Sequence, residues 1–271
     1  MATLQLQFLE DQPNKHHILS ALEQLPRGLD QTYGAAIFRI KSQPNPERIE
    51  LALKALKWLT FAKEHLQATA LRHALAIKEE TTDIEEGSLP NLQMIVAGCM
   101  GLVVLDQESG NIHLVHETTQ QYLQEYFQDQ RENGDEEIAR VCLYYFSFPQ
   151  FSRRFEGFLS LDEHLARYPL SSYASRYWFV HIREGNVEGR FVPAILKIFE
   201  CQGVRDAVFR IAEAAGAGDS RLYFSKSTML TLLHLASMHG LPILCGEILG
   251  QISGMQRLYF YPLQILIPAK Y

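Results

Sequence analysis

Apolar residues recur at helical spacing through the first half of the chain. Ile49, Leu53, Leu56 and Leu59, for example, fall on one face of a helix. Spacing of this kind predicts four helices, over residues 47–60, 69–76, 88–99 and 118–127, after a helical segment at 18–40 that is interrupted at 26–28.

Residues that favour helix ends mark two of these helices. Asn45 can cap the first, and Pro46 suits its first position because the missing N–H has no intrahelical partner there. Ser88 is the predicted cap of the third helix, and Gly98 and Gly101 predict its end.

The pattern changes from helical to strand-like after the third helix. Leu102 begins a continuous apolar run of four residues, Ser109 and Gly110 favour a turn, and residues 111–116 alternate between apolar and polar. The order of three helices, a β-hairpin and a helix is that of a winged helix, in which the hairpin covers the apolar stripes of the helices.

The second half of the chain is predicted to be helical as well. Residues 129–136 are polar and charged and predict a linker, and aromatic-rich helical patterns follow. Residues 231–250 predict two short helices joined by a turn at Gly240. The fold class predicted from the pattern is therefore mainly α.

Composition agrees with a folded protein and places it in the cytoplasm. The 271 residues are 47% hydrophobic and 21% charged, with a net charge of −6. The longest apolar run, residues 94–105, is shorter than the roughly 20 residues that span a membrane, and the first residues show no signal-peptide pattern. The four cysteines, which form no CxxC pair, predict buried thiols in a reducing compartment; they are Cys99, Cys142, Cys201 and Cys245.

Two partial motifs suggest chemistry but lack an essential residue. His116 and Glu117 begin an HExxH zinc motif, yet Gln120 stands where the second histidine belongs. The glycine-rich stretch from Gly216 has Arg221 where a phosphate-binding loop needs its second glycine. We expect the first to be a helix start and the second a helix end with its loop, so neither metal nor nucleotide is predicted.

A winged helix raises the alternative of DNA binding, which the charges disfavour. The predicted recognition helix, 89–97, holds Asn91 and Gln93 but no lysine or arginine. Residues 47–129 contain six basic and thirteen acidic side chains, a net charge of −7. Because phosphate contacts dominate DNA affinity, we expect no nucleic-acid partner.

Other side chains have a structural and a functional interpretation. Trp58 and Trp178, with the aromatic residues near them, could line a ligand pocket, but aromatic stripes at helical spacing are more often core. A Cys–His catalytic pair cannot be recognised from sequence because its members meet only in space. The doublet His16–His17 lies in a polar stretch and is expected to face solvent.

Several stretches resemble fungal NLR-like signalling proteins of the STAND class. The segment from Ala21 to Tyr33 is similar to the end of their NACHT nucleotide-binding module. Residues 55–59, 70–76, 99–106 and 112–118 are similar to the winged helix that follows it, a domain type named after GPI inositol deacylases although no catalytic serine motif is present here. The resemblance is continuous to about residue 129.

A second resemblance covers residues 231–249, which are similar to one ankyrin repeat. Thr231, His234, Ala236 and Gly240 match the repeat signature, whereas Leu232 replaces its usual proline. The tail, with Tyr261 to Gln264, is a weak trace of a second repeat. Because the NTPase core and further repeats are missing, the resemblance implies a partial version of a larger receptor-like protein.

Together these observations predict four parts and a non-catalytic role. The parts are a NACHT-like helical segment (1–43), a winged helix (44–130), a helical region (131–218) and an ankyrin-like repeat with its tail (219–271). We expect a regulatory module that binds protein partners or itself, without catalytic residues, metal, cofactor, nucleic acid or membrane. The alternatives are a hydrolase whose residues converge only in space, and a DNA-binding winged helix.

Overall fold

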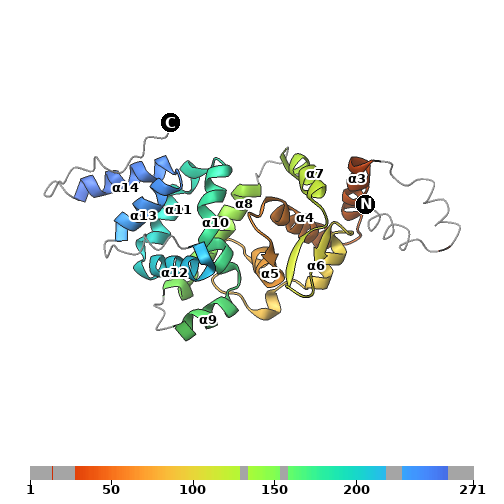
Figure 1. The fold of residues 1–271 in the computed structure, drawn as a ribbon, viewed down its shortest axis with the longest axis horizontal. Coiled ribbons are helices and arrows are strands. Elements are labelled where there is room, and N and C mark those ends of the chain that lie inside the picture. The colour runs from red at the N-terminus through yellow and green to blue at the C-terminus, as the bar shows by residue number, and fades with distance from the viewer. Residues whose placement is uncertain (1–13, 15–27, 129–133, 153–157, 218–227, 256–271) are drawn as a thin grey trace.

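The protein is mainly helical, as predicted, with one small sheet. The computed structural model describes Asn14 and residues 28–128, 134–152, 158–217 and 228–255. We refer to residues 29–128 as the N-terminal unit and to residues 134–255 as the C-terminal unit. The two lie side by side along the longest axis, with α3 (Leu29–Lys41) and α14 (Pro242–Met255) at opposite ends (Figure 1).

The N-terminal unit has its helices and hairpin in the predicted order. Its elements are α3, α4 (Pro46–Phe61), β1 (Leu66–Gln67), α5 (Ala68–Ala76), η1 (Glu86–Ser88), α6 (Leu92–Gly98), β2 (Val103–Leu105), β3 (Asn111–Leu114) and α7 (Glu117–Gln128). The cap at Asn45 is confirmed, because its side chain accepts hydrogen bonds from the N–H groups of Glu47 and Arg48.

Two local features differ from the prediction. The hairpin gains a third strand, since β1 pairs with β3 to give the antiparallel order β1-β3-β2. The cap of α6 is Asn91, whose side chain accepts from Gln93 and Met94, whereas Ser88 belongs to the separate turn η1. The prediction that Ser88 begins this helix is therefore wrong.

The C-terminal unit packs helices around α10. Its elements are α8 (Gly134–Phe146), η2 (Pro149–Ser152), α9 (Phe158–Arg167), α10 (Leu170–Glu184), α11 (Glu188–Glu200), α12 (Gln202–Ala212), the π turn η3 (Glu213–Ala217), α13 (Thr228–Met238) and α14. The linker predicted over 129–136 is wrong from Gly134 onward: Asp135 and Glu136 lie in the first turn of α8 and are buried. Residues 129–133 lie outside the described part.

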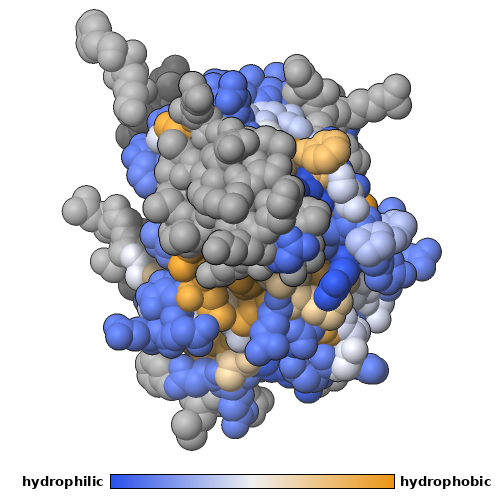
Figure 2. Space-filling view, turned by 90° about the vertical axis from the view of Figure 1, so that its right-hand side faces the viewer, coloured by the Kyte–Doolittle hydropathy of each residue, from blue (hydrophilic) through white to orange (hydrophobic). Residues whose placement is uncertain are grey.

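The units share one hydrophobic core. α8 and α10 pack against α4 and α5, and buried residues of both units form a single cluster. Seen from the end that α3 forms, the described surface is mostly hydrophilic, with a hydrophobic patch at its centre (Figure 2). Within the described residues, no helix combines the length and apolar character needed to cross a membrane.

Candidate functional site at the junction of the two units

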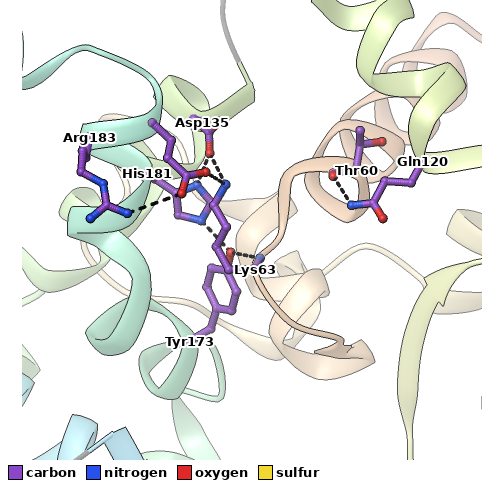
Figure 3. Close-up of polar contacts among 8 residues, drawn as sticks. Thr60, Lys63, Gln120, Asp135, Tyr173, His181 and Arg183 are labelled. Carbon is purple, nitrogen blue, oxygen red and sulfur yellow. Dashed lines mark hydrogen bonds and ion pairs between the residues drawn. The ribbon is translucent and has the colours of Figure 1, made fainter. Parts of the chain in front are cut away.

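Charged side chains join the end of α4 to α8 and α10. Lys63, in the turn after α4, places its Nζ 2.8 Å from Asp135 Oδ1 and 2.7 Å from Glu184 Oε2. In Figure 3 the side chains of Asp135, His181 and Tyr173 converge on this lysine. We call Lys63, Asp135, Tyr173, His181 and Glu184 the junction network.

The hydrogen-bond partners fix each proton in this network. Tyr173 Oη accepts the backbone N–H of Lys63 at 3.1 Å, and it lies 2.6 Å from His181 Nε2. The tyrosine therefore donates its own proton to Nε2, which leaves His181 Nδ1 as the donor to Asp135 Oδ1 at 2.6 Å. With a neutral histidine, the backbone N–H of Lys63, the Tyr173 hydroxyl and His181 Nδ1–H each have an acceptor.

Burial and charge agree with this assignment. Burial lowers the pKa of His181, against the opposing effect of Asp135. Burial alone would raise the pKa of Asp135, but hydrogen bonds from His181 and Lys63 outweigh it and hold the pKa below its ordinary value. Burial also raises the pKa of Tyr173 well above 10. The network thus holds a carboxylate, a neutral imidazole and a neutral phenol.

Two further ion pairs cross the same junction. Arg176 on α10 binds both carboxylate oxygens of Glu64, which also accepts the hydroxyl of Tyr177 at 3.1 Å. Lys57 on α4 lies 2.9 Å from Glu137 on α8. The charges of the N-terminal unit therefore fix the position of α8 and α10.

Asp135, His181 and Tyr173 are arranged like a catalytic triad, with a carboxylate that orients a base and a base that contacts a hydroxyl group. The group is enclosed, however: Asp135 is 6% exposed, His181 0% and Tyr173 2%. A substrate has no route to the tyrosine oxygen, whose two hydrogen-bond contacts are with the histidine and a backbone N–H. The arrangement is suited to holding the two units together.

A cleft of about 470 Å³ opens beside this junction. Its wall from the N-terminal unit consists of α5 and the segment that contains η1, and its other wall is formed where α9 ends and α10 begins. The lining residues are Thr69, Arg72, His73, Ile84, Glu85, Glu86, Leu89, Ala166, Arg167 and Pro169. This cleft is a concave site that a small molecule can enter.

The half zinc motif has a structural role in the described structure. His116 Nδ1 lies 3.1 Å from the N–H of Thr118, in the first turn of α7, and 3.0 Å from the Thr118 hydroxyl. Gln120 turns away and donates to the carbonyl of Thr60 (Figure 3). Among the described residues, no group of three or more His, Cys, Asp or Glu side chains is placed to hold a metal ion.

The other residues singled out from sequence are scattered. Gly216 ends the helical run with a φ of +80°, as expected of a helix end. Trp58 and Trp178 are core residues, which confirms the packing interpretation. His16–His17, Ser220, Arg221 and the tail with Tyr261 lie outside the described residues.

The cysteines agree only in part with the prediction of buried thiols. Cys99 and Cys142 are buried, and burial raises the pKa of the Cys99 thiol to about 12. Cys245 is half-buried and Cys201 is exposed, so the prediction is wrong for Cys201. Neither buried thiol is available for nucleophilic chemistry.

Comparisons with known proteins found no match for the chain. No model of a known protein family matches it, and neither a curated protein nor a solved structure does.

Proposed function

We propose that this chain is a non-catalytic regulatory module of the cytoplasm that binds protein, in the first place a second copy of itself. In this proposal the N-terminal unit is a winged helix and α13–α14 is an ankyrin-type repeat of a NACHT-associated, NLR-like protein. The order of elements supports the first assignment. Gly240, whose φ is +68°, supports the second, because it forms the left-handed turn between α13 and α14.

The composition of α13–α14 carries the proposal. Over residues 228–251 the single charged side chain of the Asp, Glu, Lys and Arg types is Glu247. A helix on a protein surface normally carries a polar stripe, and one that is apolar all round is normally buried. Yet Met238 is 55% exposed and Ile243 is 50% exposed. The helix pair thus has the composition of an internal layer, yet one of its sides faces solvent.

The inner side of this pair already binds other helices. α14 packs on α11, and Glu188 of α11 accepts the N–H of Leu244 in the first turn of α14 at 2.7 Å. His239, at the turn, stacks on Phe179 of α10 with ring centroids 3.4 Å apart. The pair is therefore held in place from one side, and its other side presents a preformed apolar surface.

Charge favours a second copy as the occupant. The N-terminal unit is acidic, so two copies would repel each other if they met through it. The α13–α14 surface carries almost no charge, so it can face its own copy without like-charge repulsion. A two-fold contact of this kind matches the same apolar patch on both subunits.

The test is the oligomeric state of the whole chain across a concentration series, measured by sedimentation velocity. We expect a dimer with a dissociation constant in the micromolar range or tighter, as for interfaces of standard size. Met238→Lys and Ile243→Lys, at exposed positions that tolerate a charge in the monomer, should weaken the dimer at least about tenfold.

The matched control is Phe38→Lys on α3, at the opposite end of the molecule. Phe38 is 71% exposed, more than either test residue, so its substitution reports any general effect of removing surface hydrophobicity. The proposal requires this variant to dimerise like the unsubstituted chain. A chain that stays monomeric up to about 100 μM, or a dimer that Phe38→Lys alone dissociates, would overturn it.

A further inference from the structure

The cleft between the two units has hydrogen-bond donors on one wall. Thr69, Arg72 and His73 come from α5, and the spacing of three and four residues places them on one face of that helix. Arg167 lies on the opposite wall, from the last turn of α9. Both units therefore contribute to the cleft.

His73 contributes a ring nitrogen, Nε2, to this cleft wall. The ring is buried, with 6% of the residue exposed, and Nδ1 lies 3.0 Å from the hydroxyl of Tyr145. With the Tyr145 hydroxyl as the donor to Nδ1, the histidine proton sits on Nε2. Within the described residues, Nε2 makes no hydrogen bond, and the residue lines the cleft.

Arg72 is held in place and already binds a carboxylate. Its Nε donates to the carbonyl of Pro90 at 2.8 Å, which fixes the guanidinium at the cleft wall. Its Nη2 donates to Glu86 Oε1 at 3.1 Å, but the Glu86 side chain is 80% exposed. An exposed ion pair of this kind is weak, so a better-placed carboxylate can displace it.

The remaining lining residues restrict the ligand further. Ile84, Leu89, Ala166 and Pro169 give the cleft apolar walls. Arg167 is already paired with Asp83 at 3.0 Å, so Arg72 is the guanidinium of this cleft whose carboxylate partner, Glu86, is exposed. Glu85 and Glu86 at the same cleft disfavour a dianion.

We propose that this cleft binds a small organic monocarboxylate with an apolar body. One carboxylate oxygen takes the place of Glu86 on Arg72, the other accepts from His73 Nε2 and the Thr69 hydroxyl, and the apolar body lies against Ile84 and Leu89. Burial holds the pKa of His73 at about 4, so the ring is a neutral donor at neutral pH. The inference does not depend on the proposed dimer, because the cleft lies at the junction of the two units.

The test uses sodium hexanoate as the probe and the whole chain with ¹⁵N-labelled histidine. Titration should move the Nε2–H signal of His73 with a dissociation constant of about 0.1–1 mM, in line with the size of the probe. Hexanol lacks the charge, and inorganic phosphate lacks the apolar body. Each should bind at least about tenfold more weakly than hexanoate.

Three variants separate the proposed site from a structural ion pair. Arg72→Gln should weaken hexanoate binding about tenfold or more, and Thr69→Val should weaken it a few-fold. Glu86→Gln should tighten binding about two- to fivefold, because it removes the internal competitor. Arg48→Gln, an exposed arginine on α4 of the same unit, is the matched charge control and should have no effect.

The outcomes decide the proposal in either direction. A shift of the His73 signal by hexanoate that Arg72→Gln abolishes and Glu86→Gln strengthens would support it. The absence of any shift at about 10 mM hexanoate would overturn it. Binding that Glu86→Gln weakens, or phosphate binding as tight as that of hexanoate, would overturn it as well.

Discussion

Asp135 Oδ1 lies 2.6 Å from His181 Nδ1, between the first turn of α8 and the last turn of α10. The same oxygen lies 2.8 Å from Lys63 Nζ of the N-terminal unit. One carboxylate oxygen therefore joins α8 and α10 to each other and to the turn after α4. The way the two units are held together depends on this buried charge.

Replacing the carboxylate should destabilise the protein strongly. Asp135→Asn keeps the shape but leaves Lys63 with a partly buried ammonium whose remaining carboxylate partner is the more exposed Glu184. Loss of a buried ionic partner costs about 3 kcal/mol, and we expect about 2–4 kcal/mol here, measured by urea unfolding.

The control for this variant is an ion pair on the surface. Glu50 and Lys54 form an i,i+4 pair with side chains that are 65% and 41% exposed. Glu50→Gln should lower the free energy of unfolding by less than about 0.5 kcal/mol. Equal effects of the two substitutions would contradict the special role of the junction network.

Acid should destabilise the fold before its carboxylates are protonated. Burial lowers the pKa values of His73, His164 and His239 to about 4, and it also lowers that of His181. An unfolded chain has histidine pKa values near 6.5, so between about pH 6.5 and 4 it binds more protons than the folded chain. The free energy of unfolding should therefore fall steadily as the pH is lowered through this range.

The urea midpoint at pH 7, 5.5 and 4.5 measures this loss. His239→Phe keeps the stacked ring against Phe179 and removes one of the four titrating groups. The pH profile of this variant should be less steep than that of the unsubstituted chain. A profile that is flat from pH 7 to 4.5, or one that His239→Phe leaves unchanged, would contradict the assignment of buried neutral histidines.

The local pattern of apolar and polar residues is sufficient to predict the helices and the hairpin of the N-terminal unit. The cap at Asn45 and the strands on either side of Gly110 depend on residues that are neighbours in the chain. The strand β1 was missed because its two residues, Leu66 and Gln67, are too few to show a period. The mainly α fold class was therefore predictable.

The junction network was not predictable in the same way. Lys63 and Asp135 are 72 residues apart, and either one taken alone looks like a surface charge. Asp135 was assigned to a linker because its neighbours are polar. A signal was nevertheless present, since Tyr173, Tyr177 and His181 recur four residues apart, next to the buried Trp178. A histidine on the buried side of an aromatic helix needs a polar partner from another element.

Close packing between α12 and η2 leads to a prediction about one glycine. A Cβ atom built at Gly203 would overlap the carbonyl oxygen of Ser152, a backbone atom that cannot move away easily. Gly203→Ala should therefore destabilise the protein by about 1–3 kcal/mol. Thermal unfolding, followed by circular dichroism, measures the change.

Gly246 in α14 is the matched control for this substitution. A Cβ atom there meets nothing within 4 Å, and the position is interior to a helix. Gly246→Ala should therefore stabilise the protein by about 0.5–1 kcal/mol. If both substitutions changed the midpoint in the same direction, the contact between α12 and η2 would not be as close as described.

Two residues near the start of α6, Ser88 and Asn91, could each cap the helix, but only Asn91 does so. Ser88 and Asn91 both belong to the preferred cap types, so propensity alone could not choose between them. In the structure, Asn91 accepts from two N–H groups of α6, whereas the Ser88 hydroxyl donates to the carbonyl of Glu85, the residue before η1. Asn91→Ala should cost about 1 kcal/mol in urea unfolding, and Ser88→Ala should stay within about 0.5 kcal/mol. If Ser88→Ala proved the more destabilising of the two, the helix would begin at the residue that the sequence pattern favoured.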